Sequence, residues 1–206
     1  MHYNPKEYEY VDLGLPSGLL WATMNIGANS ETDYGLYFAW GETTGYPDAS
    51  TKQFSWNDYK YSNNGGSTAA DMTKYNSTDG KTVLDIEDDV VRVNWGGTWR
   101  MPTVDELRAL SNAVNAVWTT NYNGSGINGL LYTDINNSSK TLFFPAAGNC
   151  GDGLFVGRGS TGRYWSSSLY SPNAKSSRYL LFHSGGKFND AISRYCGHSV
   201  RGVLDN

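Results

Sequence analysis

The sequence predicts an α+β domain made mainly of short strands, with two helices in its first half. Three observations indicate this class. The 206 residues suit one compact domain spanning 1–206. Turn-rich segments separate short aromatic or alternating runs, and only two segments carry helical periodicity. No repeat of about 20–50 residues is present, which excludes solenoids and propellers.

The first third is expected to consist of strands and loops. Residues 8–21 alternate apolar and polar side chains around residues 15–18 (LPSG), which predicts a hairpin. The aromatic run at residues 34–40 predicts a buried strand. Residues 43–80 are rich in Gly, Ser, Thr, Asn and Asp, which indicates a long surface excursion. Four aromatic side chains are expected to anchor it: Phe54, Trp56, Tyr59 and Tyr61.

Two segments predict helices. Residues 85–94 carry apolar side chains at helical spacing. The second helix starts at Thr103, because Thr103 and Glu106 form a capping box directly after Pro102. It is expected to extend to near Trp118, with one apolar face. That face consists of Leu107, Leu110, Val114 and Val117.

Strand patterning returns at Leu130 and continues to the end of the chain. Glycine-rich connections such as residues 184–187 join the runs. The expected strands are residues 141–145, 164–168, 178–184 and 199–203.

Charge and hydropathy exclude several classes of protein. A net charge of −4 provides no basic surface for nucleic acid. No apolar run approaches the roughly 20 residues of a membrane-spanning helix. Residues 1–5 lack the charged head and apolar stretch of a signal peptide, so none is visible. A mature secreted fragment and a phage protein would both fit these features.

Metal and cofactor signals are weak, and we expect neither group. The three histidines, His2, His183 and His198, have no zinc-site spacing, and the last two are expected to be exposed. Cys150 and Cys196 leave one disulfide or two free thiols equally open. The acidic cluster at residues 85–89 lacks a calcium-loop pattern and is expected to favour a helix N-terminus.

Catalytic motifs are equally weak. Residues 157–162 match G-x-G-x-x-G, but a strand pattern follows where a dinucleotide site needs a helix, so we expect a flexible loop. No G-x-S-x-G elbow is present. A distant pair of glycosidase carboxylates stays open, although no particular pair is indicated.

The last fifty residues are the best candidates for ligand binding. They are rich in Tyr, Ser, Gly, Asn, Arg and His, the side chains of adaptable recognition surfaces. Composition alone equally fits ordinary loops of a glycine-rich β domain. The candidate region spans about residues 155–201. Its candidate ligand-binding residues are Arg163, Leu169, Ser171, Asn173, Leu181, His183, Phe188, Asn189, Asp190, Ala191, Ser193, Tyr195, Cys196 and His198.

Six ordered blocks cover most of the chain. They are residues 11–23 with 25–27 (VDLGLPSGLLWAT and NIG), 34–42 (YGLYFAWGE), 95–103 (WGGTWRMPT) with Glu106 and Leu107, 144–148 (FPAAG), 164–168 (YWSSS) and 197–201 (GHSVR). Together they resemble the major paralogous domain family of gut Bacteroidetes. The chain is also similar to the variable proteins of diversity-generating retroelements, including those carried by gut phages.

This resemblance implies a C-type-lectin-like fold, with small antiparallel sheets, two helices, long loops and a C-terminal binding face. It also implies that template adenines, mostly in Asn codons, are randomised during copying. Such codons never yield Lys, Glu, Gln, Trp or Met, and all fourteen candidates hold permitted types. The resemblance makes Cys196 a diversified position and places Trp165 in the core or at its edge. Residues expected to be invariant are Tyr164, Trp165, Ser166, Gly197, Ser199, Val200 and Arg201.

The expected function is therefore non-enzymatic display of a diversified ligand-binding surface. The expected partner is a protein or glycan on a cell surface, and the expected location is extracellular, at a cell surface or on a phage virion. One alternative is a fixed carbohydrate-binding or adhesin-type surface domain. A second is an enzyme similar to the sulfatase-activating enzymes, which use a cysteine pair. Ligand identity and oligomeric state stay open.

Overall fold

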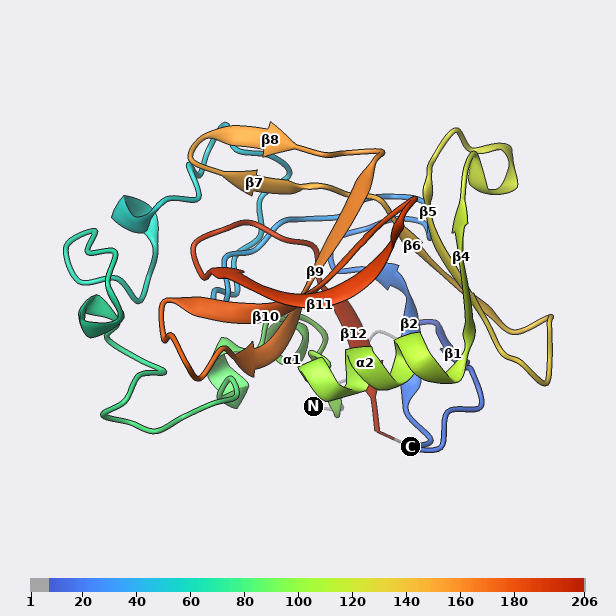
Figure 1. Cartoon of the computed structure of the whole chain (residues 1–206), viewed down its shortest axis with the longest axis horizontal. Helices are drawn as coiled ribbons and strands as arrows, with labels where there is room; N and C mark the ends of the chain where they lie inside the picture. The colour runs from blue at the N-terminus through green and yellow to red at the C-terminus, as the bar shows by residue number, and fades with distance from the viewer. Residues whose placement is uncertain (1–7, 206) are drawn as a thin grey trace, which may run out of the picture.

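The computed structural model describes residues 8–205 (Figure 1). Its elements are small antiparallel sheets and, within these residues, two α-helices, which confirms the α+β class. A four-stranded sheet has the order β1 (Tyr10–Asp12), β2 (Leu20–Asn25), β12 (Arg201–Leu204) and β3 (Trp99–Arg100). The C-terminal strand thus lies between strands from the first half of the chain.

Three further sheets complete the strands. One contains β9 (Thr161–Leu169), β10 (Ser176–His183) and β11 (Gly186–Ser193), in the order β11–β10–β9. The second contains β4 (Asn115–Thr119), β5 (Gly129–Thr133) and β6 (Thr141–Pro145). The last is the hairpin of β7 (Asn149–Gly151) and β8 (Leu154–Val156). In Figure 1 this hairpin lies at the top, opposite α1 and α2.

The predicted N-terminal hairpin is confirmed. Strands β1 and β2 pair from Tyr10 with Ala22 to Asp12 with Leu20. The turn is closed where the Gly18 amide donates to the Leu15 carbonyl at 2.9 Å.

Both helices form, with different ends from those predicted. In the first segment, a 3₁₀ turn (Ile86–Asp88) precedes α1 (Val90–Trp95), and the Asp89 carboxylate caps α1. Helix α2 (Val104–Ala113) has the predicted capping box of Thr103 and Glu106. It ends before Val114 instead of near Trp118, because β4 follows at once and pairs along its length with β5.

The buried aromatic run at residues 34–40 is not a regular strand. It forms only isolated bridges, from Tyr37 to Tyr46 and from Phe38 to His198. Gly35 and Gly41 have positive φ values of 69° and 78°, which interrupt an extended ladder at both ends. The prediction of a strand is therefore wrong, and the prediction of burial is confirmed for residues 37–40, whereas residues 34–36 are half-buried.

The excursion at residues 43–80 contains no strand, as expected. Two 3₁₀ turns, Trp56–Asp58 and Ala69–Asp71, are its regular elements. Three of its four predicted anchors, Phe54, Tyr59 and Tyr61, are buried, and Trp56 is half-buried.

Strand β9 divides two hydrophobic clusters. Tyr164 belongs to the cluster beneath α2, whereas its neighbour Trp165 belongs to the cluster that contains Trp40. Adjacent strand residues point to opposite faces, so β9 is buried on both sides along this stretch. The other residues expected to be invariant, Ser166, Gly197, Ser199, Val200 and Arg201, are also buried.

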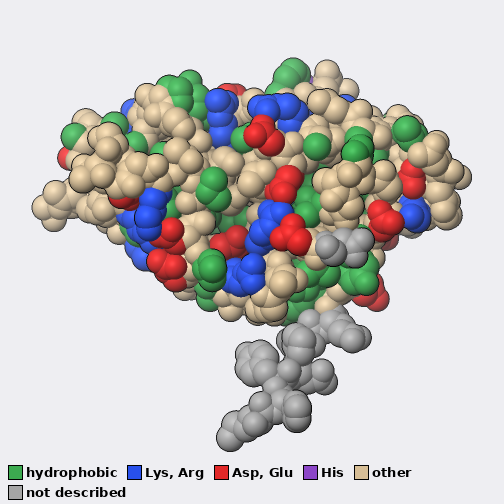
Figure 2. Space-filling model, turned by 90° about the horizontal axis from the view of Figure 1, so that it is seen from below, with side chains coloured by type: hydrophobic (Ala, Val, Ile, Leu, Met, Phe, Trp, Pro, Cys, Tyr) green, Lys and Arg blue, Asp and Glu red, His purple; other side chains and the backbone are tan. Residues whose placement is uncertain are grey.

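The two ends of the described chain contact neighbouring elements, α1 and β3. Tyr8 stacks on Trp95 with ring centroids 4.1 Å apart, and Asp205 pairs with Arg100 at 2.7 Å. Figure 2 shows this side from below, where basic and acidic side chains alternate without a basic patch. Within residues 8–205, the two α-helices have six and ten residues, and neither could cross a bilayer.

Candidate ligand-binding surface

One face of the β9–β10–β11 sheet carries five of the predicted residues. Leu181 on β10 lies opposite Arg163 on β9 and Phe188 on β11. Opposed residues in antiparallel strands project from the same face, so these side chains lie side by side. His183 and Asp190 are each two residues further along and share that face. Phe188 is 51% exposed. We call these five residues the outer face.

The opposite face of the sheet is largely closed. Tyr164 and Leu180 project into the cluster that α2 covers. The edge strand β11 also turns Asn189, Ala191 and Ser193 to this side, and all three are half-buried. The predicted residues of β11 therefore alternate between the two faces of the sheet.

Two more predicted residues lie in the loop between β9 and β10. Ser171 is exposed, and Asn173 is half-buried, with its Oδ1 accepting from the Lys175 amide at 3.3 Å. Both line a groove of about 420 Å³ between this loop and residues 69–82. Most of the length of β9 separates Ser171 and Asn173 from Arg163 on the outer face. At about 3.3 Å per strand residue, this distance is roughly 20 Å.

Tyr195 is half-buried and contacts residues that the sequence did not indicate. Its hydroxyl donates to Asp152 Oδ2 at 3.1 Å, and its ring meets that of Trp56 edge-on at 4.9 Å. Burial raises the pKa of the Tyr195 hydroxyl to about 12. Arg163 Nη1 donates to Asn149 Oδ1 at 2.8 Å. Asn149 and Asp152 lie on and beside β7, outside the predicted region of about 155–201.

Sequence reasoning missed these three contacts for different reasons. Trp56 was predicted only as an anchor of the excursion. Asn149 and Asp152 carry no local signal of binding, and only the fold brings the β7–β8 hairpin beside β9.

His198 is not exposed, and that expectation is wrong. Its side chain has 0% exposure. Its backbone bridges to Phe38 in the core, and its ring stacks on Trp165 at 4.1 Å and meets Tyr179 at 4.9 Å. Both ring nitrogens lack a hydrogen-bond partner. Burial, together with the nearby charge of Arg163, lowers the pKa of the His198 imidazole well below its usual range.

Two further candidates are also interior. Cys196 packs in the same hydrophobic cluster as Trp165, and Leu169 is buried at the end of β9, where its amide donates to the Thr82 carbonyl at 2.8 Å. Cys196 is not part of the exposed surface, and Leu169, at 8% exposure, only lines the groove beside Ser171. Composition cannot show this, because the burial of Leu169 and Cys196 depends on packing with segments far away in the sequence, such as those of Thr82 and Cys150.

Both cysteines are free and buried. Cys150 and Gly197 exchange backbone hydrogen bonds at 2.9 Å, so Cys196 lies opposite Gly151. The two thiols therefore point to opposite sides of this pairing. Burial raises the pKa of each thiol to about 12, which keeps both protonated.

Arg194 links the excursion to the candidate surface. It lies between Ser193 and Tyr195 in the sequence and is completely buried. Its guanidinium donates to the Tyr59 hydroxyl at 2.8 Å and to the carbonyls of Ala174 and Lys74 at 2.8 and 3.0 Å. Four aromatic rings surround it: Trp40, Tyr59, Tyr61 and Tyr75.

Backbone strain lies at the same junction. Phe54 and Tyr75 adopt positive φ values of 50° and 58°, which bulky residues rarely do. Tyr75 packs on Arg194, and a Cβ on Gly197 would lie 2.6 Å from the Phe54 ring. Such strain persists only where the surrounding contacts hold it, so segment 194–198 is tightly fixed.

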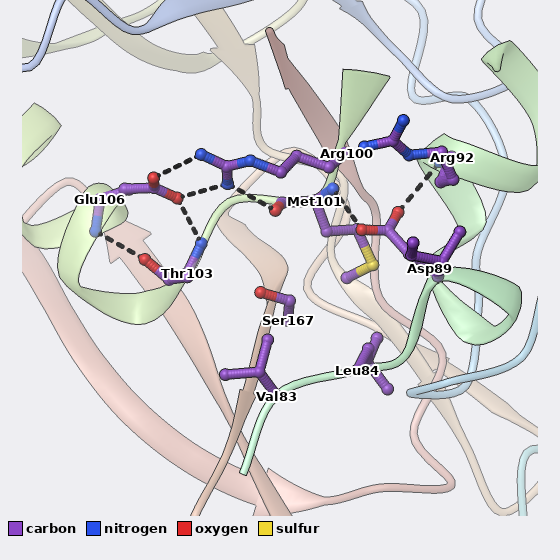
Figure 3. Close-up of a pocket in the computed structure, with 10 residues that line it drawn as sticks. Val83, Leu84, Asp89, Arg92, Arg100, Met101, Thr103, Glu106 and Ser167 are labelled. Carbon is purple, nitrogen blue, oxygen red and sulfur yellow. Dashed lines mark hydrogen bonds and ion pairs between the residues drawn. The ribbon is translucent and has the colours of Figure 1, made fainter. Parts of the chain in front are cut away.

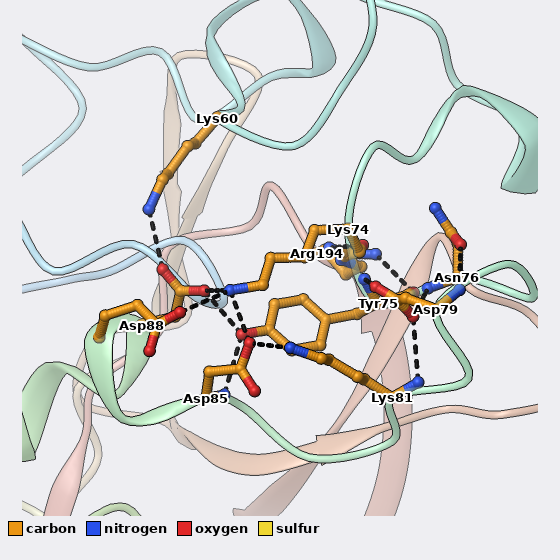
Figure 4. Close-up of polar contacts among 10 residues, drawn as sticks. Lys60, Lys74, Tyr75, Asn76, Asp79, Lys81, Asp85, Asp88 and Arg194 are labelled. Carbon is orange, nitrogen blue, oxygen red and sulfur yellow. Dashed lines mark hydrogen bonds and ion pairs between the residues drawn. The ribbon is translucent and has the colours of Figure 1, made fainter.

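The acidic cluster is an ion-pair network (Figure 4). Carboxylate oxygens of Asp85, Glu87 and Asp88 lie within 4.8 Å of one another. Lys74 Nζ lies among them, 2.7 Å from Asp85 and 2.5 Å from Asp88, and Lys60 pairs with Asp88 at 2.9 Å. These partners hold the pKa of Asp88 well below its usual range despite its burial. The network holds the excursion against the start of α1.

A cavity of about 250 Å³ lies between α1 and α2 (Figure 3). Of its four charged side chains, Asp89, Arg100 and Glu106 are hydrogen-bonded within the chain, whereas Arg92 Nε has no partner. Arg100 binds Glu106 through both terminal nitrogens at 2.8 and 2.7 Å. Asp89 accepts from the amides of Val91 and Met101 at 2.9 and 2.8 Å. These groups fix the two helix N-termini.

Comparison of the chain with protein-family models, with curated proteins and with solved structures finds no match.

Proposed function

We propose that this chain is a non-enzymatic ligand-binding display protein with a C-type-lectin-like fold. Its C-terminal surface, within about residues 155–201, is diversified by a retroelement through adenine mutagenesis. The ligand is a protein or glycan on a cell surface, and the protein is displayed on a bacterial surface or a phage virion. The six sequence blocks motivate this proposal, and the placement of their residues supports it.

One observation carries the proposal: Phe188 and Asp190 are exposed on a strand that pairs with β10 along its whole length. On β9, Tyr164 and Trp165 lie in the two hydrophobic clusters. Arg163, on the same face as Trp165, and Leu181 are half-buried at the border of the core. The exposed side chains can therefore change without altering the core, which is what a diversified surface needs. The protonated thiols, facing apart, fit this non-enzymatic role.

Two randomised libraries test this division. The surface library varies Arg163, Leu181, Phe188 and Asp190 among the residues that an altered Asn codon encodes. The matched control library applies the same codons at Tyr164, Trp165, Leu180 and Phe182.

We expect most surface-library members to fold, because none of the four side chains is fully buried and exposed substitutions, as at Phe188 and Asp190, usually change stability by less than about 0.5 kcal/mol each. Most control members should be lost to proteolysis, since truncating a buried aromatic costs about 3–5 kcal/mol. Equal survival of the two libraries contradicts the proposal. The gene adds an independent test: a nearby copy of its last third should differ almost only at adenines.

A fixed carbohydrate-binding domain is the second candidate, favoured by the contact of Trp56 with Tyr195. Two aromatic rings next to the Asp152 carboxylate could stack on a sugar and accept its hydroxyls. A glycan array separates the two candidates. This candidate requires one glycan class that the wild type binds and W56A does not.

A further inference from the structure

Strand β11 is the open edge of its sheet. It pairs with β10 over all eight residues, from Gly186 to Ser193, without a bulge. No strand of residues 8–205 pairs with its other side. Such edges are usually blocked by proline, a bulge, charged side chains or a covering segment, because their free backbone groups pair readily with another chain. Of the residue-level devices, β11 has only two charged side chains, Lys187 and Asp190. Eight regular residues make β11 long enough to pair with a further strand.

The predicted binding residues of β11 lie on both faces of this edge. Phe188 and Asp190 project to the outer face, whereas Asn189, Ala191 and Ser193 project to the other. A ligand placed flat on the outer face could not reach the second group. Only a ligand that approaches the edge of the sheet contacts both groups at once.

The backbone groups of this edge point toward such a ligand. The Ala191 amide donates to Asp190 Oδ1 at 2.8 Å, so it faces away from β10. Amides two residues apart in a strand point to the same side, which places those of Lys187, Asn189 and Ser193 at the open edge as well. In the free protein, the Asp190 carboxylate accepts a hydrogen bond from one of these four amides, that of Ala191.

The edge also carries two opposite charges. Lys187 and Asp190 are three residues apart, and neither takes part in an ion pair within the described chain. A strand beside β11 with an acidic and a basic residue at matching positions would pair both charges. A peptide backbone supplies this combination of alternating hydrogen bonds and side chains, whereas a glycan does not.

We infer that β11 binds an extended segment of a protein ligand, which adds a fourth strand to the β9–β10–β11 sheet. This inference rests on the proposed function and specifies its ligand as a protein. Backbone pairing would supply an affinity that does not depend on sequence, and the variable side chains on both faces would supply specificity. Diversification could then change the ligand while the mode of binding stays the same.

The test uses twelve-residue random peptides displayed on phage and selected against the full chain. Selected peptides are synthesised, and their affinities are measured by fluorescence anisotropy. The key variant is A191P, which removes one edge amide and leaves those that face β10. The matched control A191V changes the same side chain but keeps the amide. F188S tests the outer face.

We expect A191P to weaken peptide binding at least tenfold and A191V to change it less than threefold. Peptides N-methylated at alternate residues should lose binding with a period of two. This arm uses wild-type protein and decides the question if A191P fails to fold. One outcome overturns strand addition and leaves the proposed function intact. In it, selected peptides bind A191P as tightly as the wild type, N-methylation does not weaken their binding to the wild type, and F188S abolishes binding.

Two other outcomes overturn the inference. Recovery of no peptide, with binding only on a glycan array, replaces the protein ligand with a glycan. Selected peptides whose affinity is unchanged by A191P, by N-methylation and by F188S bind elsewhere. That result contradicts both this inference and the proposed function.

Discussion

Replacing His198 with Phe should remove a pH-dependent loss of stability. The imidazole is completely buried, stacks on Trp165 and has no hydrogen-bond partner for either nitrogen. Phe is similar in size and can keep the stacking. It also removes two unpaired polar atoms, each of which costs about 1–3 kcal/mol when buried. At pH 7.5 we therefore expect H198F to be at least as stable as the wild type.

The magnitude at lower pH follows from proton linkage. The His198 pKa lies well below its ordinary value of 6.5 in the folded chain and near 6.5 in the unfolded chain. The contribution of neutral His198 to the free energy of unfolding is complete above pH 6.5. It is lost as the pH falls, because only the unfolded chain gains the proton. At pH 5.0 the wild type should have lost about 2 kcal/mol through this group. H198F should not show that loss.

Urea unfolding followed by tryptophan fluorescence measures the effect at pH 7.5, 6.5, 5.5 and 5.0. The carboxylates of the Lys74 network also have lowered pKa values, but their contribution falls mainly below this range and is common to both proteins. H183N is the matched control, because it removes a half-buried histidine at the end of β10. Parallel pH profiles for H198F and wild type would refute a buried, neutral His198.

Three other changes probe the division between core and surface. W165A should destabilise the chain by about 3–5 kcal/mol in the same urea assay, whereas D190S should stay within about 0.5 kcal/mol, and similar losses would contradict the assignment. R194A should lower the melting temperature by more than 5 °C, because it empties the aromatic cage and leaves buried carbonyls unpaired; an unchanged melting temperature by calorimetry would show that the excursion does not depend on it. Native Cys150 and Cys196 should react with a thiol reagent at pH 8 at least a hundredfold more slowly than in urea, since both are buried and protonated; rapid native labelling would place a thiol at the surface.

Local signals in the sequence predicted local structure. The start of α2 follows from Thr103 and Glu106, which contact each other across a single turn. The end of α2 could not be predicted in this way. No helix-ending signal lies near Val114, and the strand that follows is stabilised by pairing with β5. The strand β11 was not predicted either. Its two faces are both partly exposed, so apolar and polar residues do not alternate along it.

The candidate surface was predictable in outline only. Composition indicated the last fifty residues, but the meeting of Arg163, Leu181 and Phe188 depends on strand register. The burial of His198 depends on its bridge to Phe38, which lies 160 residues earlier in the chain. No pattern near position 198 carries that information.

The two ends of the described chain contact α1 and β3, which determines how the molecule could be attached to a carrier. Tyr8 and Asp205 make these contacts, whereas the β7–β8 hairpin, with its contacts to Arg163 and Tyr195, lies at the other end of the molecule (Figure 1). A carrier fused to either terminus, or a bead coupled there, would leave the far end pointing into solution. The domain could thus be arrayed in many copies, each with its contact residues unobstructed.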